Sequence, residues 1–208
     1  MSDIRWFTET KDGHSQWYAS HFRELAARGD DLDGEARLVD AVVAPGSRIL
    51  DAGCGQGRTG AALHRRGHTV TGVDVDPVLI EAARVDYPGP TWVLADLATL
   101  DLASGDPSGD PSDGAFDAVV MAGNVITFVA PGTEQQVLAS IARHVRPDAP
   151  LITGFHTARM QVADFDRHAL LAGWAVEQRF ATWDLRPWHA DADFAVTILR
   201  APAQRSSS

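Results

Sequence analysis

The sequence predicts an α/β protein: a doubly wound, mostly parallel sheet of seven strands with helices on both faces and a C-terminal antiparallel hairpin. Apolar strand-like runs alternate with segments of helical periodicity along most of the 208 residues. The early runs are apolar almost throughout, as strands covered on both faces must be. The last two runs, 174–183 and 193–201, have no helix between them, so we expect them to pair as a hairpin at the sheet edge.

Two helices precede the first strand. Residues 15–29 form the first, with Ser15 as its N-cap and Gly29 after its last turn. Residues 33–43 form the second, which Pro45 stops.

Five strands then alternate with helices. Asp76 followed by Pro77 is typical of a helix start, because the missing N–H of proline costs nothing at the first helical position. Thr133 and Gln136 fit a capping box at the start of a later helix. The strands are expected at 48–53, 68–76, 91–96, 116–123 and 150–155, and the helices at 57–66, 77–87, 133–145 and 161–173.

Length and composition fit one domain. We expect a single domain over 1–208, with N-terminal cap helices at 1–45, a core sandwich at 46–200 and a flexible tail at 201–208. Residues 105–114 carry a doubled Asp-Pro-Ser and no apolar side chain, which predicts a mobile surface loop between the third and fourth strands. A functional lid is the alternative for this loop.

The charge balance argues against several classes of partner. The chain has 28 Asp and Glu against 18 Lys and Arg, a formal net charge of −10, with no run of basic residues. Phosphate backbones and anionic membranes attract clustered cations, so we expect neither nucleic acid nor membrane as a partner. The sequence also has no apolar run of roughly 20 residues, and its first residues lack the apolar core that is typical of a signal peptide. With Cys54 as its single cysteine, we expect a cytoplasmic protein that acts on a small molecule.

The stretch ILDAGCGQGRTG, residues 49–60, places a glycine-rich loop between a strand and a helix. Such a loop at the carboxyl end of a strand is typical of nucleotide sites, and two ligands compete for it: a dinucleotide or S-adenosylmethionine. Asp51 favours the second, because a carboxylate before the first glycine repels a pyrophosphate and attracts a cationic amine. The alternative is that Asp51 only satisfies amides of the loop.

Two further acids end the next strands. Asp74 lies about 20 residues after the loop, where an acidic side chain accepts from ribose hydroxyls in several classes of nucleotide enzyme. Its alternative role is a helix cap, which Asp76 fills better. Asp96 ends the third strand and can accept a hydrogen bond from an adenine amino group, or else is a solvated acid at a strand end.

Together, the segments ILDAGCGQG, VTGVDVDP, WVLADL, FDAVVMAGN and HVRPDAPLITGF resemble the class I S-adenosylmethionine-dependent methyltransferases over roughly residues 15–200. The resemblance implies the Rossmann-like methyltransferase fold, whose seven-stranded sheet has an antiparallel last strand. One departure is Ala149-Pro150, where many members have a glycine before the fifth strand.

The resemblance also implies which residues contact the cofactor. Asp51 and the glycines Gly53, Gly55 and Gly57 would line the methionine part. Asp74 would hold the ribose, with Val75 beside the adenine, while Asp96 and the backbone of Leu97 would hold the adenine amine. The remaining expected contacts are Ala122 near the sulfur and an aromatic side chain of the leading helix, Trp17 or Tyr18.

The segment after the fourth strand narrows the range of possible methyl acceptors. It lacks the Pro-Pro motif of enzymes that methylate amino groups of nucleic acids, the cysteine of cytosine-C5 enzymes, and the carboxylate cluster of metal-dependent catechol enzymes. Candidate acceptor contacts are Asn124 and an aromatic wall from Trp183, Arg186 and Trp188. His156 and His189 are candidate bases, because histidine changes charge near neutral pH. Each of these side chains has a plain structural alternative: a turn cap, a packed loop or an ordinary surface histidine.

The sequence therefore predicts methyl transfer from S-adenosylmethionine to oxygen or nitrogen of a small-molecule acceptor, without a metal. The step is an in-line displacement that depends mainly on positioning, and it leaves S-adenosylhomocysteine as product. The alternative is a non-catalytic protein of this fold that binds S-adenosylmethionine or S-adenosylhomocysteine. The sequence gives weaker support to an NAD-dependent oxidoreductase. Such an enzyme would need an acid/base pair such as Tyr with a nearby Lys, and Lys11 is the only lysine.

Overall fold

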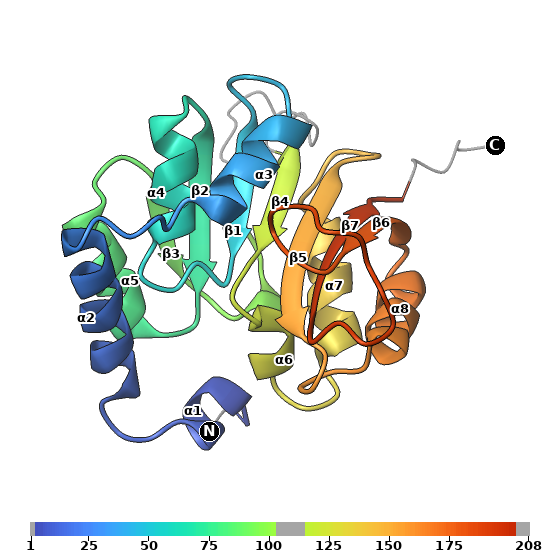
Figure 1. The fold of residues 1–208 in the computed structure, drawn as a ribbon, viewed down its shortest axis with the longest axis horizontal. Coiled ribbons are helices and arrows are strands. Elements are labelled where there is room, and N and C mark those ends of the chain that lie inside the picture. The colour runs from blue at the N-terminus through green and yellow to red at the C-terminus, as the bar shows by residue number, and fades with distance from the viewer. Residues whose placement is uncertain (1–2, 103–114, 203–208) are drawn as a thin grey trace.

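The computed structural model describes residues 3–102 and 115–202, which form a seven-stranded sheet with helices on both faces (Figure 1). The strand order is β3-β2-β1-β4-β5-β7-β6. The first five strands are parallel, and β7 runs antiparallel to both β5 and β6. The strands are β1 (Arg48–Ala52), β2 (Thr69–Asp74), β3 (Thr91–Leu94), β4 (Ala118–Met121), β5 (Pro150–His156), β6 (Ala175–Phe180) and β7 (Phe194–Arg200).

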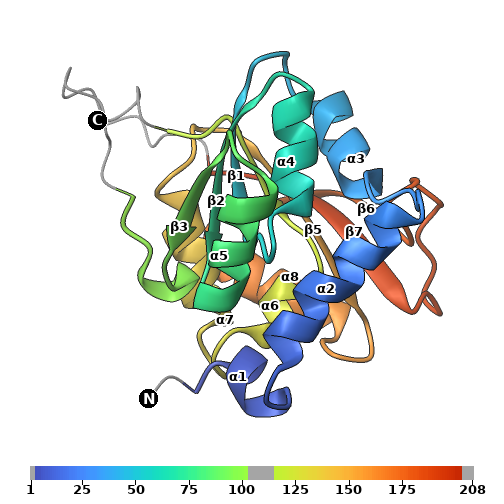
Figure 2. The same ribbon diagram turned by 90° about the vertical axis from the view of Figure 1, so that its left-hand side faces the viewer.

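Helices cover the sheet and extend over its carboxyl edge (Figure 2). They are α1 (Arg5–Glu9), α2 (His14–Ala27), α3 (Gly34–Val42), α4 (Arg58–Arg65), α5 (Pro77–Asp86), the 3-10 helix η1 (Leu97–Thr99), α6 (Val125–Phe128), α7 (Glu134–Ala142) and α8 (Val162–Leu171). Among the described residues, no helix has the length and apolarity that a membrane crossing requires.

Alternating side chains of the strands build two apolar clusters, one on each face of the sheet. Leu50 and Leu151 pack with residues of α7 and α8, whereas Ile49 and Ile152 pack with residues of α3 and α4. Burial on both faces explains why these strands are apolar almost throughout their length. The predicted fold class is therefore confirmed, including the antiparallel C-terminal pair.

Several expected elements are confirmed, and some details were wrong. Asp76 caps α5 by accepting from Val78 N, with Pro77 at the first helical position. The capping box was wrong: Thr133 Oγ1 donates to the Ala130 carbonyl oxygen, and Gln136 Nε2 reaches the Ala98 carbonyl oxygen at 3.0 Å.

Ser15 is also not a helix cap. Helix α2 begins at His14 with Gly13 as its N-cap residue, and Ser15 Oγ donates to Asp76 Oδ2 instead. The short elements α1, α6 and η1 were not predicted. The loop expected at 105–114 lies outside the described residues, as does the expected tail beyond residue 202.

Candidate functional site

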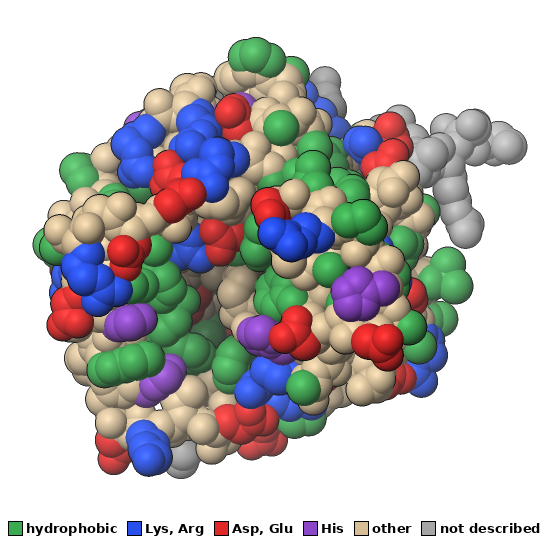
Figure 3. All heavy atoms as spheres, in the orientation of Figure 1, with side chains coloured by type: hydrophobic (Ala, Val, Ile, Leu, Met, Phe, Trp, Pro, Cys, Tyr) green, Lys and Arg blue, Asp and Glu red, His purple; other side chains and the backbone are tan. Residues whose placement is uncertain are grey.

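A pocket opens at the carboxyl ends of β1, β2 and β4. These strands meet where the sheet order reverses, since β1 pairs with both β2 and β4, and open α/β sheets bind ligands at this switch point. Figure 3 shows a hollow there, between α2 and α6, rimmed by hydrophobic and histidine side chains. The pocket encloses about 850 Å³, including open solvent at its mouth. Its lining comes from the N-terminal segment, from the carboxyl ends of β1 and β2, and from the segments that follow β1, β2, β3 and β4. The lining residues are Ile4, Trp6, Tyr18, Asp51, Gly53, Cys54, Gly55, Gln56, Arg58, Thr59, Asp74, Val75, Leu79, Asp96, Leu97, Ala122, Gly123, Val125, Phe128 and Val129.

The loop after β1 turns through three glycines in the left-handed region. Gly53, Gly55 and Gly57 have φ values of 77°, 55° and 90°, where a side chain adds strain. A Cβ on Gly53 would lie 2.4 Å from Val125 Cγ1, and one on Gly57 would lie 2.8 Å from the Trp92 ring. Gly53 and Gly55 therefore shape the pocket wall, while Gly57 permits close packing of the loop against β3.

Asp51 lines this pocket and has one carboxylate oxygen without a hydrogen-bond partner among the described residues. Its side chain projects from β1 and is 1% exposed, and the backbone N–H of Gly60 donates to it. Its Oδ2 and the Nε2 of Gln56 have no hydrogen-bond partner within the described part of the chain. Burial raises the pKa of Asp51 to about 7. Two residues that line the same pocket thus have one buried acceptor and one buried donor unsatisfied, and such groups call for a polar ligand or water.

Asp74 is held in a fixed orientation by two backbone amides. Its Oδ2 accepts from Gly55 N at 2.8 Å and its Oδ1 from Asp76 N at 2.9 Å. Burial raises the pKa of Asp74 to about 6, although these hydrogen bonds act in the opposite direction. Asp96 caps η1 by accepting from Ala98 N at 2.9 Å. The acids that end β2 and follow β3 therefore both reach the pocket from fixed positions.

Arg58, which the sequence analysis missed, ties the loop to the N-terminal helices. Its guanidinium donates to Glu35 and to the Leu32 carbonyl oxygen at 2.6 Å, and lies 5.1 Å from the centre of the Phe22 ring. Because its partners come from α3 and the preceding loop, Arg58 fixes these segments beside the pocket. The signal for it was its place directly after the third glycine.

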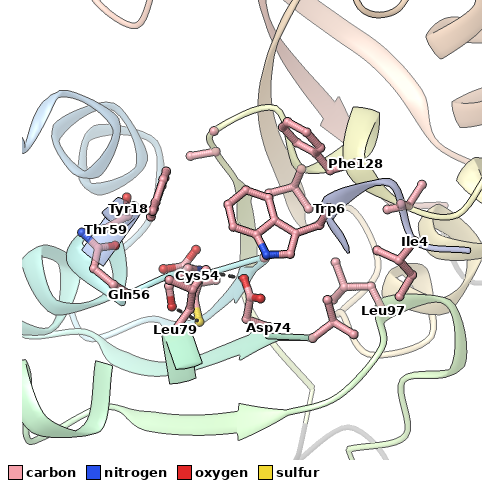
Figure 4. Close-up of a pocket in the computed structure, with 18 of the residues that line it drawn as sticks. Ile4, Trp6, Tyr18, Cys54, Gln56, Thr59, Asp74, Leu79, Leu97 and Phe128 are labelled. Carbon is pink, nitrogen blue, oxygen red and sulfur yellow. Dashed lines mark hydrogen bonds between the residues drawn. The ribbon is translucent and has the colours of Figure 1, made fainter. Parts of the chain in front are cut away.

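The N-terminal segment contributes the pocket's aromatic wall. Tyr18 lines the pocket, and burial raises the pKa of its hydroxyl, which keeps it protonated. Trp17 does not belong to the described lining: it is 57% exposed and stacks on His21 at 5.2 Å between ring centroids. Its ring also lies 5.3 Å from that of His14, which contacts Trp6. Trp6 and Ile4 line the pocket but were not predicted, because the polar N-terminal residues before α2 show no helical periodicity. Figure 4 shows the Trp6 indole between Tyr18 and Phe128.

The structure does not bring the expected acceptor residues together. Trp183 packs over Gly154 beside the α3–α4 cluster, whereas Trp188 packs against the α7–α8 cluster on the other face. Arg186 is exposed and pairs with Asp184 at 3.5 Å, and His189 is exposed as well.

Asn124 and His156 form a local turn contact. Asn124 has φ 66° and accepts from the His156 backbone N at 2.7 Å through its Oδ1. The His156 ring is exposed and lies edge-on to Phe194. Both residues lie next to the pocket end of β4 and β5, but neither belongs to the described lining.

Within residues 3–102 and 115–202, no three or more His, Cys, Asp or Glu side chains are grouped so that they could hold a metal ion.

Comparisons with known proteins identify the family. A model of the methyltransferase domain matches residues 49–148. A crystal structure of a TehB-like SAM-dependent methyltransferase from Corynebacterium glutamicum is 38% identical, with a TM-score of 0.83. The match covers 93% of this chain and 100% of that chain. The chain belongs to the class I S-adenosylmethionine-dependent methyltransferases.

Curated relatives of this methyltransferase include two O-methyltransferases. The magnesium-protoporphyrin O-methyltransferase of Rhodobacter capsulatus is 38% identical over 96 residues, which are 46% of this chain and 39% of that protein. The ubiquinone biosynthesis O-methyltransferase of Xanthomonas campestris is 33% identical over 125 residues, and the match covers 53% of this chain and 49% of that protein. The chain thus spans about half or less of the length of these curated relatives.

Proposed function

We propose that this methyltransferase transfers the methyl group of S-adenosylmethionine to oxygen or nitrogen of a small-molecule acceptor. The observation that carries the proposal is the unpaired, buried Asp51 oxygen in a pocket at the sheet's switch point. It suits the α-ammonium group of the cofactor, because a buried carboxylate needs a cationic or hydrogen-bonding partner. The two curated O-methyltransferases support oxygen as the acceptor atom.

The residues present fit both ends of the cofactor's methionine part. Asp51 Oδ2 is an unused acceptor for the ammonium group, and Gln56 Nε2 is an unused donor for the carboxylate. Gly53 and Gly55 line the pocket and have no side chains that would cover the loop backbone. We infer that these residues hold the methionine part.

The other end of the pocket suits a nucleoside. Asp74 retains free lone pairs after accepting two amide hydrogen bonds, and a carboxylate can take up to about four, so we infer that it accepts from the ribose hydroxyls. Val75 and Leu97 would flank the adenine, and Asp96 would accept from its amino group. Ala122 at the end of β4 would lie beside the sulfur, with Tyr18 over the opposite wall.

The cofactor supplies an activated methyl group, so the chain's residues have to align an acceptor and exclude water. Alignment alone can contribute about 7–11 kcal/mol. Trp6, Tyr18 and Phe128 line the pocket with aromatic rings that would shield a bound cofactor from water. A site shielded in this way would suit a small acceptor better than a polymer. The net charge of −10 further supports a function without nucleic acid or an anionic membrane, in the cytoplasm.

We also propose that residues 1–45 act as cap helices within one domain. Helix α2 packs against α5, and α3 packs against α4. These contacts join the N-terminal helices to the sheet's own helices, which supports a single cooperative unit rather than a separate module.

Affinity for S-adenosylhomocysteine is expected to fall as the pH is lowered from 8 to 5. Asp51 has to be ionised to hold the ammonium group, and burial raises its pKa to about 7. Below pH 7, each pH unit should weaken binding about tenfold. Isothermal titration calorimetry across this range measures the slope, which Asp51→Asn should flatten. An equal slope in the variant would assign the dependence to another group.

Stability of the free protein should follow the opposite trend over part of that range. Because the pKa values of Asp51 and Asp74 are raised to about 7 and about 6, the folded state binds their protons more tightly than the unfolded chain. Their contribution to stability is complete below about pH 4 and is lost as the pH rises to about 7. Thermal unfolding of wild type and Asp51→Asn over this range isolates the contribution of Asp51.

The acceptor class can be tested with cell extract divided by ultrafiltration. The filtrate, which holds only small molecules, should support formation of S-adenosylhomocysteine from S-adenosylmethionine. Activity confined to the retained protein and nucleic acid would contradict a small-molecule acceptor. Binding of S-adenosylmethionine without turnover on either fraction would favour the non-catalytic alternative.

A further inference from the structure

The carboxylate of Asp76 joins three segments of the chain at the edge of the pocket. It is 1% exposed, and its Oδ1 caps α5 by accepting from Val78 N at 2.8 Å. Its Oδ2 accepts from Trp6 Nε1 at 2.7 Å and from Ser15 Oγ. The backbone N–H of Asp76 also orients Asp74. One residue therefore connects the N-terminal segment to the acid proposed to hold the ribose.

Trp6 forms part of the pocket wall as well as donating to Asp76. Its indole lies edge-on to Tyr18 and to Phe128, with ring centroids 5.7 Å and 5.5 Å apart. Figure 4 places it above Asp74, with Ile4 and Leu97 beyond it. The indole thus occupies a position between the two ends of the pocket, where it would contact the nucleoside part of a bound ligand.

Helix α1 is held at its other side by two ion pairs. Arg5 donates to Glu134 at the start of α7 at 3.0 Å, and Glu9 pairs with Arg159 after β5 at 2.6 Å. The Arg159 guanidinium also lies 4.1 Å from the centre of the Phe128 ring. A helix of five residues is not stable alone in water. Its position across the pocket therefore depends on these contacts and on Trp6.

We propose that residues 4–9 form a strap over the cofactor pocket, and that Trp6 is a cofactor-contacting residue whose bond to Asp76 keeps the strap closed. The inference rests on the proposed cofactor site. A ligand beneath the strap fills the space under the indole and strengthens its packing between Tyr18 and Phe128. Release requires Trp6 to leave Asp76, so the rate of release depends on that bond.

The Trp6→Phe variant tests the bond, because it keeps an aromatic ring and removes the indole N–H that donates to Asp76. A hydrogen bond to a charged group contributes about 1.5–3 kcal/mol, which corresponds to about 10- to 150-fold. We expect S-adenosylhomocysteine to dissociate at least about tenfold faster from Trp6→Phe in stopped-flow displacement. The matched control is Tyr87→Phe, which also keeps an aromatic ring and removes one donor, but outside the described pocket lining, and should leave the rate unchanged.

Hydrogen exchange provides a readout that a merely structural role for Trp6 would not change. The amides of Phe7 and Thr8 bond to the Ile4 carbonyl oxygen at 3.0 Å and 3.2 Å, so they report on the strap. S-adenosylhomocysteine should protect them in wild type and in Tyr87→Phe, and less in Trp6→Phe.

The outcomes separate failure of the strap from failure of the cofactor site. If wild type does not bind S-adenosylhomocysteine, the proposed site itself is wrong. If wild type binds it, but the dissociation rate is the same in Trp6→Phe and the amides of residues 7 and 8 are unprotected, the strap is wrong while the site stands. An unchanged melting temperature of the free variants shows that any difference does not come from misfolding.

Discussion

Replacing Asp51 with asparagine should weaken binding of S-adenosylmethionine and S-adenosylhomocysteine by about 2–5 kcal/mol, or roughly 30- to 4,000-fold. The variant keeps the shape of the side chain but removes the charge that the ammonium group requires. Calorimetry at pH 8 measures the loss. The matched control is Asp101→Asn, which removes one exposed charge away from the described pocket lining and should bind as wild type does.

The same substitution should raise the stability of the free protein. The pKa of Asp51 is raised to about 7 because burial penalises the ionised form, and each pKa unit corresponds to about 1.36 kcal/mol. At pH 8 we therefore expect Asp51→Asn to be about 1–4 kcal/mol more stable than wild type, and the difference to shrink as the pH falls from about 7 to about 4. Loss of affinity together with gain of stability identifies a binding group. Loss of both would instead make Asp51 a structural residue.

Substituting Gly53 with alanine should give the second large effect, a destabilisation of several kcal/mol. The residue has φ 77°, which costs about 1–2 kcal/mol for a residue with a side chain. Its Cβ would also lie 2.4 Å from both methyl carbons of Val125, and overpacking of this kind adds about 1–3 kcal/mol. Chemical denaturation of the free protein measures the total.

Gly132 provides the matched control for this experiment. It has φ 81°, and nothing lies within 4 Å of the Cβ that alanine would add. Gly132→Ala therefore includes the backbone strain without the clash, and should destabilise by only about 1–2 kcal/mol. Equal losses in the two variants would show that the approach of α6 to the glycine loop is unimportant.

The three acids of the pocket could be predicted from sequence because each lies at or just after the end of a parallel strand. Parallel strands place their carboxyl ends at one edge, so Asp51, Asp74 and Asp96 had to converge once the strands were recognised. Alternating burial on two faces made those strands easy to find. For these strands, the apolar pattern of the sequence and the topology of the parallel sheet led to the same prediction.

Residues whose positions depend on long-range contacts could not be predicted. Trp6 reaches the pocket through a bond to Asp76, 70 positions away, from a helix too short to show periodicity. Ser15 has the chemistry of a helix cap, but its hydroxyl bonds to the same distant carboxylate. Trp183 and Trp188 are five positions apart, yet they pack against opposite faces of the sheet. For these side chains, tertiary packing sets the direction in which each one points, and the neighbouring sequence does not predict it.

The measurement that tests the central claim most directly is thermal unfolding with saturating S-adenosylmethionine, S-adenosylhomocysteine and NAD in parallel. A ligand at 100 times its dissociation constant stabilises by about 2.7 kcal/mol, and each kcal/mol shifts the midpoint by roughly 2–4 °C for a domain of this size. We expect both S-adenosyl compounds to raise the midpoint by about 5–11 °C in wild type, and by much less in Asp51→Asn, with no shift from NAD. A shift with NAD alone, or equal shifts in wild type and Asp51→Asn, would contradict the assignment of Asp51 to a methionine ammonium site.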